Sequence, residues 1–217
     1  MEKVQFISYI LYLCFVVPML LSLFILQKRA RLVIGYILVG ATLCLFISEL
    51  NGALYSLMGV GDLYFCITVS PLTEEIIKAL PVLAYAFFIS DNRSKLVEAS
   101  FAVGLGFAIF ENMIMVSQNV DTISVPWALI RGFGAGLMHS VCTVAVGIGI
   151  AFVRKKKKLF CCGTLALLML AVTYHAIYNT IVMSPYKYFG FTLPLSTYIP
   201  ILYFYLKKSK KNLEERL

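Results

Sequence analysis

The stretch Ser70-Pro71-Leu72-Thr73-Glu74-Glu75-Ile76-Ile77-Lys78-Ala79-Leu80-Pro81 decides how this sequence is understood. Two adjacent carboxylates and a lysine lie inside a run that is otherwise largely apolar from residue 63 to residue 89. An ionisable group in hydrocarbon costs roughly 2.5–3.5 kcal/mol on insertion scales, so three within two helical turns need a reason. On a helix, Lys78 lies one turn after Glu74 and Glu75 and can pair with either carboxylate. A structural ion pair between membrane helices is one explanation, and a functional site is the other.

The composition is that of a membrane protein. Of the 217 residues, 60% are hydrophobic and 14% are charged, whereas a soluble domain carries about 25% charged residues. We therefore expect an all-α fold, a polytopic transmembrane helical bundle surrounded by the lipid bilayer. Residues 1–206 are predicted to form a single transmembrane helical domain, and residues 207–217 a basic cytoplasmic tail. The net charge of +8 would suggest nucleic acid in a soluble protein, but its distribution favours membrane orientation, and we expect no nucleic-acid partner.

Seven segments meet or approach the length of about 20 apolar residues that one membrane helix needs. They are residues 4–27, 32–57, 63–90, 96–118, 125–153, 159–183 and 189–206. The links between them alternate in charge, because 15 of the 19 basic residues follow the first, third, fifth and seventh segments. The positive-inside rule then predicts an N-terminus outside and a C-terminus in the cytoplasm. That orientation requires an odd number of spans, and seven satisfies it.

The start of the third span has two interpretations. Ser70 followed by Pro71 is typical of a helix start, with serine as the N-cap and proline at the first helical position. The helix could therefore begin at Pro71, with residues 59–69 as an outer re-entrant or interfacial segment. Alternatively, the helix runs through residues 63–90. Both alternatives place Pro71 and Pro81 on either side of the carboxylate pair.

Polar side chains of complementary type recur in the next three segments. The fourth carries Glu111, the fifth carries Arg131 and His139, and the sixth carries His175 and Asn179 one helical turn apart. At a rise of 1.5 Å per residue, these groups and the carboxylate pair lie in the outer half of the bilayer or near its midplane. The pattern therefore predicts that four helices bring carboxylates, imidazoles and an amide to one polar pocket.

This set of groups suits the hydrolysis of an amide without a covalent intermediate. A carboxylate in a desolvated pocket can act as a general base towards water, and a neighbouring imidazole can orient that water. An imidazole and an amide one turn apart can donate hydrogen bonds to a developing oxyanion. The sequence contains neither GxSxG nor HExxH. Two histidines and two glutamates could also bind zinc between helices; we expect no cofactor and keep zinc as the less favoured alternative.

In this order, the residues resemble the motifs of the PrsW family of glutamic-type intramembrane proteases. Residues 74–78 match EExxK, residues 107–111 match FxxxE, and residues 175–179 match HxxxN/D, while His139 follows a stretch that contains arginine and glycine. That family belongs to a superfamily with the CAAX-prenyl endopeptidases and the bacteriocin-immunity (Abi) proteins. The motifs cover the third to sixth predicted helices, about half of the chain.

The resemblance implies a role for each matching residue. The substrate would be a membrane-anchored protein or peptide, such as an anti-sigma factor cut first near its extracytoplasmic side, in a bacterial plasma membrane. The implied roles are a water-activating base (Glu74) helped by an imidazole (His139), a carboxylate that orients the site or pairs with a cation (Glu75, with Lys78 or Arg131), an oxyanion pocket (His175 and Asn179) and a second acidic participant (Glu111).

Two other classes of function use the same residue types. A proton-coupled transporter could use the glutamates, histidines and lysine as a relay, although no inverted repeat is visible in the sequence. A catalytically silent relative that binds or protects, as an immunity protein does, is the second alternative. The protease is favoured because no member of the proposed set is replaced by an apolar residue.

Overall fold

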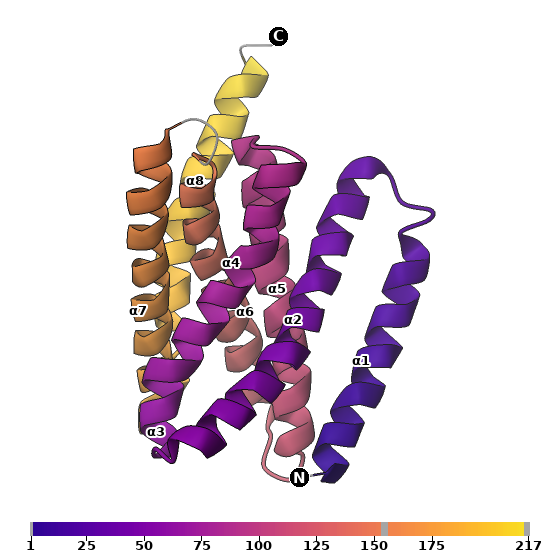
Figure 1. The fold of residues 1–217 in the computed structure, drawn as a ribbon, viewed down its shortest axis with the longest axis vertical. Helices are drawn as coiled ribbons and strands as arrows, with labels where there is room; N and C mark the ends of the chain where they lie inside the picture. The colour runs from indigo at the N-terminus through magenta and orange to yellow at the C-terminus, as the bar shows by residue number, and fades with distance from the viewer. Residues whose placement is uncertain (1, 153–155, 215–217) are drawn as a thin grey trace.

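The described part of the chain is helical and contains no strand. The computed structural model describes residues 2–152 and 156–214, which form a bundle of long helices (Figure 1). The all-α prediction is confirmed for these residues. The long helices are α1 (Glu2–Ser22), α2 (Lys28–Met58), α4 (Ser70–Phe88), α5 (Arg93–Gln118), α6 (Val125–Ile150), α7 (Thr164–Val182) and α8 (Thr192–Glu214). The short elements are α3 (Asp62–Tyr64), the π-helical turns η1 (Phe65–Val69) and η2 (Leu159–Gly163), and the 3₁₀ turn η3 (Lys187–Phe189).

Each predicted membrane segment corresponds to one long helix, but not every helix meets the length and polarity of a membrane span. Among the described residues, four stretches are long and apolar enough to cross a bilayer: Lys28–Met58, Arg93–Gln118, Val125–Ile150 and Leu159–Val182. Helix α4 carries three charged residues within 19, and the apolar part described for α1, Phe6–Ser22, is shorter. The chain is thus a multi-pass helical protein, while the count of seven spans and the orientation stay predictions.

The helix with the charged motif begins before Ser70. The backbone is helical from Asp62 through η1 into α4, and Ser70 itself has φ −58° and ψ −50°. The alternative in which the helix starts at Pro71 is therefore wrong, and the longer span of residues 63–90 is the better description. The π-helical turn accommodates Pro71, which has no N–H for the carbonyl of Ile67. The Ser70 N–H instead reaches five residues back to the Phe65 carbonyl.

Helix α5 lies at the centre of the bundle and packs closely against α2 and α6. The backbones approach at glycines, where a side chain would not fit. A Cβ atom at Gly40 would lie 2.1 Å from the Val103 carbonyl oxygen. One at Gly104 would lie 2.5 Å from the carbonyl oxygen of His139. The second contact fixes the part of α6 that carries this histidine.

Helix α1 lies at the edge of the bundle beside α2 (Figure 1). Helix α8 extends beyond the end of the bundle that is opposite α3. Tyr12 packs edge-on against Phe110 of α5, with ring centroids 5.3 Å apart. Helix α8 continues through the predicted boundary at residue 206 to Glu214. Arg154 and Lys155 of the basic link, and Arg216 of the tail, lie outside the described residues.

Candidate functional site

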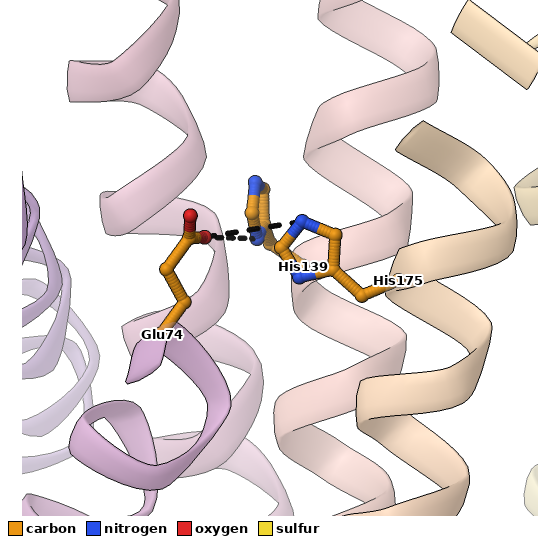
Figure 2. Close-up of side chains that lie close together, drawn as sticks. All are labelled: Glu74, His139 and His175. Carbon is orange, nitrogen blue, oxygen red and sulfur yellow. Dashed lines mark ion pairs between the residues drawn. The ribbon is translucent and has the colours of Figure 1, made fainter. Parts of the chain in front are cut away.

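The structure brings the predicted polar residues of α4, α6 and α7 into one buried cluster. Glu74 and Glu75 on α4, His139 on α6 and His175 on α7 are all buried, and Lys78 is fully enclosed. Figure 2 shows the Glu74 carboxylate directed at both imidazoles. The two imidazoles that face Glu74 therefore come from residues 65 and 101 positions later in the sequence.

The two oxygens of Glu74 have different surroundings. Oε1 accepts a hydrogen bond of 2.6 Å from the Ser70 hydroxyl, one helical turn earlier. Oε2 lies 3.9 Å from Nε2 of His175 and 4.0 Å from Nδ1 of His139. This buried oxygen has no hydrogen-bond partner among the residues that the structure describes. One oxygen of the carboxylate is therefore held and the other is available.

Glu75 fixes the orientation of His175. Its Oε1 accepts from Lys78 Nζ at 2.7 Å and from His175 Nδ1 at 2.9 Å. A carboxylate paired with a lysine only accepts hydrogen bonds, so Nδ1 of His175 carries the proton in a neutral ring. The lone pair of Nε2 then points at Oε2 of Glu74. Two acceptors that face each other at 3.9 Å require a donor or a cation between them.

His139 is held between a cation and a carboxylate. Lys78 Nζ lies 2.8 Å from its Nδ1, and an ammonium group only donates, so Nδ1 accepts. Its Nε2 then donates to Oε2 of Glu111 at 3.3 Å, and Arg131 Nη2 pairs with the same oxygen at 3.0 Å. The ring also packs against His175, with centroids 4.9 Å apart.

The charges of the cluster do not balance. Lys78 pairs with Glu75 and Arg131 pairs with Glu111, which leaves Glu74 as the third carboxylate for two permanent cations. A buried charge without a partner destabilises the fold. A protein is expected to keep one only where the charge has a function or binds water or an ion. Glu74 is consequently the group best suited to bind water or a cation.

A cavity of about 400 Å³ leads from this cluster to the end of the bundle where α3 lies. Glu74, Glu111 and Arg131 form its inner wall, and Trp127 and Ile130 of α6 line one side. Its outer rim is formed by the links after α5 and α7, including Asn119, Thr122, Lys187 and Tyr188. Glu74 is therefore reached from one end of the bundle.

The predicted oxyanion pair is arranged differently from the expectation. Asn179 lines the cavity, and its side-chain nitrogen donates to the carbonyl of Cys66 at 2.8 Å. In the π-helical register this carbonyl would accept from residue 71, which is a proline and has no N–H. Asn179 supplies the missing donor and keeps one further amide hydrogen. His175 has no free N–H in this arrangement, because its protonated nitrogen is bonded to Glu75.

The same three side chains also have donor atoms close enough to hold a metal ion. Donor atoms of Glu74, His139 and His175 lie within 4.8 Å of one another, and each imidazole has a carboxylate on its other nitrogen, as metal-binding histidines do. Lys78 opposes this use, because the lone pair that accepts its hydrogen bond on His139 cannot also bind a cation. Glu74 and His175 thus fit a metal ion as they are placed, and His139 does not.

Sequence reasoning missed two polar residues next to Glu74. The sequence predicts Ser70 as a helix cap in one of the two alternatives, whereas its hydroxyl binds the Glu74 carboxylate. Asn51 of α2 bonds Ser70 and Thr73. The available signal is an amide side chain within the second apolar segment, residues 32–57.

The model of one protein family matches residues 28–206 of the chain; that family is described as the PrsW family intramembrane metalloprotease. The matched region includes every residue of the cluster. No curated protein and no solved structure matches the chain.

Proposed function

Because the chain belongs to the PrsW family of intramembrane proteases, we propose that it is an endopeptidase that hydrolyses a membrane-anchored protein or peptide at Glu74. The family supports a membrane-embedded peptidase. The observation that carries the assignment to this site is Oε2 of Glu74, buried and without a hydrogen bond from the described residues, opposite the lone pair of His175 Nε2.

In this mechanism one water molecule bridges the two acceptors. It donates one hydrogen to Oε2 of Glu74 and the other to Nε2 of His175, and its lone pairs face the cavity. Glu74 takes the proton as the water oxygen bonds to the scissile carbonyl carbon. Ser70 keeps the second carboxylate oxygen in place during this transfer. Glu75 and Lys78 hold the imidazole that orients the water.

The tetrahedral intermediate that follows carries a negative oxygen. The remaining amide hydrogen of Asn179, at the wall of the cavity, is suited to donate to it. Glu74 then returns its proton to the leaving nitrogen as the carbon–nitrogen bond breaks. His139 stays bonded between Lys78 and Glu111 and supports the charge pattern around Glu74. The proposal is thus a glutamic-type mechanism, and with it a place for the chain in the superfamily that also holds the CAAX-prenyl endopeptidases and the Abi proteins.

A metal-dependent mechanism is the second candidate, because the family description names a metalloprotease and both imidazoles have carboxylate partners. Glu74, His175 and, after displacement of Lys78, His139 would hold the ion. A bound zinc ion would polarise the scissile carbonyl and make water more acidic.

Chelation separates the two candidates. We expect purified protein in detergent to cleave a single-pass reporter at the same rate before and after treatment with EDTA and 1,10-phenanthroline. The reason is that the hydrogen bond from Lys78 uses the Nδ1 lone pair that His139 would need as the third metal ligand. The Glu74→Gln variant serves as the inactive control in both conditions. Loss of cleavage in chelator, with recovery on adding zinc, would replace the water mechanism by the metal mechanism.

We further propose seven spans with the N-terminus outside and the C-terminus in the cytoplasm of a bacterial plasma membrane. Two observations support this: α1 begins and α8 ends at opposite ends of the bundle (Figure 1), and basic residues gather in alternate links. The cavity then opens towards the extracytoplasmic side, near the links after α5 and α7. That opening suits a first cut near the outer end of a substrate's membrane span, as in an anti-sigma factor.

A further inference from the structure

The Glu74 carboxylate is the end of a hydrogen-bond chain that starts on a different helix. Ser70 donates to Oε1 of Glu74 at 2.6 Å. A hydroxyl has one hydrogen, so Ser70 must accept in its other contact, the 3.2 Å bond from the side-chain nitrogen of Asn51 on α2. The Asn51 oxygen lies 2.7 Å from the Thr73 hydroxyl, which is also within hydrogen-bond distance of the Ser70 and Val69 carbonyls, at 2.9 and 3.2 Å. Because the Ser70 hydrogen is given to Glu74, the amide of Asn51 has to turn its nitrogen towards Ser70.

This chain determines which oxygen of Glu74 is available. Serine and threonine hydroxyls on these helices commonly bond the carbonyl one turn earlier, as Ser140 does to Gly136 and Thr143 does to His139. Ser70 instead points one turn forward, to the carboxylate. The Asn51 side-chain N–H favours this rotamer, because its hydrogen bond requires a lone pair of the Ser70 oxygen to face α2. With Oε1 held, Oε2 faces the two imidazoles.

Asn51 lies behind the catalytic cluster. Ser70 and Glu74 line the 400 Å³ cavity, whereas Asn51 lines a second recess of about 300 Å³ with Tyr55, Asp62 and Phe65; Cys66 borders both. Asn51 is not among the residues that line the main cavity, whereas its hydrogen-bond partner Ser70 is.

We propose that Asn51 is a positioning residue, which acts through Ser70 to hold the Glu74 carboxylate with Oε2 towards the histidines. This inference rests on the proposed function of Glu74. It assigns a catalytic contribution to α2, a helix outside the four motifs. The effect is expected on the chemical step, because Asn51 orients the base and does not line the substrate cavity.

The test measures kcat and KM for reporter cleavage by four variants. Asn51→Leu, which keeps the size of the side chain and removes its hydrogen bonds, should lower kcat about tenfold, the equivalent of one hydrogen bond, with KM unchanged. Ser70→Ala should lower kcat by a similar or larger factor. The double variant should be no slower than Ser70→Ala alone, because both changes break one chain. Thr42→Val is the matched control on α2; its hydroxyl bonds Tyr12 and the Leu38 carbonyl, and its kcat should equal that of the wild type.

Wild-type kcat in Asn51→Leu, or effects that multiply in the double variant, would overturn the inference. So would an equal loss in Thr42→Val, since this would indicate a general loosening of α2. The Glu74→Gln variant in the same assay shows whether the positioning role alone fails or the proposed function fails with it. If Glu74→Gln is inactive while Asn51→Leu is fully active, only the positioning role is lost; if Glu74→Gln cleaves normally, the proposed function is lost with it.

Discussion

Glu74→Gln is expected to abolish cleavage of a single-pass reporter, with kcat reduced about 10³-fold, the middle of the range for removing a general base. The amide has the size of the carboxylate and can still accept from Ser70 at Oε1. It cannot take a proton from water, so binding persists while the chemical step fails. Measured kcat and KM for the purified variant should show the loss in kcat, with KM nearly unchanged.

Glu98→Gln provides the matched control for this substitution. Glu98 pairs with Arg29 at 2.7 Å near the surface, where Arg29 is 78% exposed, and exposed pairs of this kind contribute about 0–1 kcal/mol. We expect wild-type kcat for Glu98→Gln. Retained cleavage in Glu74→Gln would refute the role of Glu74 as the base.

Lys78→Met is expected to have the largest effect on stability. The amine is fully buried between Glu75 and His139 and also lies 4.6 Å from the centre of the Phe107 ring. Removing one member of a buried ion pair leaves its partner charged and without compensation, at a cost of about 3–5 kcal/mol. Thermal unfolding in detergent should show a midpoint lower by roughly 10 °C.

The double variant Glu75→Gln/Lys78→Met separates charge from packing. Because both charges are removed together, we expect it to be more stable than Lys78→Met alone. If the two variants unfold at the same temperature, the lost packing of the lysine stem explains the effect, and the ion pair contributes little. Cleavage should remain low in both variants. In Lys78→Met, Glu75 loses its cation; in the double variant, His175 also loses its carboxylate partner.

Much of the site could be anticipated from the sequence because charge is so costly in an apolar segment. Glu74, Glu75, Glu111, His139 and His175 were singled out by that cost, and the structure brings them together. The spacing of Lys78 predicted a pair with either carboxylate, and it bonds Glu75. Their catalytic roles remain proposals.

The directions of the side chains could not be anticipated, because they depend on contacts between helices. The amide of Asn179 bonds the Cys66 carbonyl, to which Pro71 can give no backbone hydrogen in the π-helical register. Serine before proline is a common helix start, and nothing local to the sequence indicates that Ser70 continues a helix from Asp62. Hydrophobic patterns predict helices well, but they do not specify which hydrogen of an amide or imidazole is already used.

The substrate complex of the Glu74→Gln protein is the most direct test of the site. An electron cryomicroscopy map of this inactive variant with an intact single-pass substrate would locate the scissile bond. We expect its carbonyl carbon close enough to residue 74 for one water molecule to bridge them, with the carbonyl oxygen towards Asn179 and the peptide in the cavity that Trp127 and Ile130 line. A scissile bond bound elsewhere, or side chains of residues 74, 139 and 175 turned away from one another, would refute the shared site.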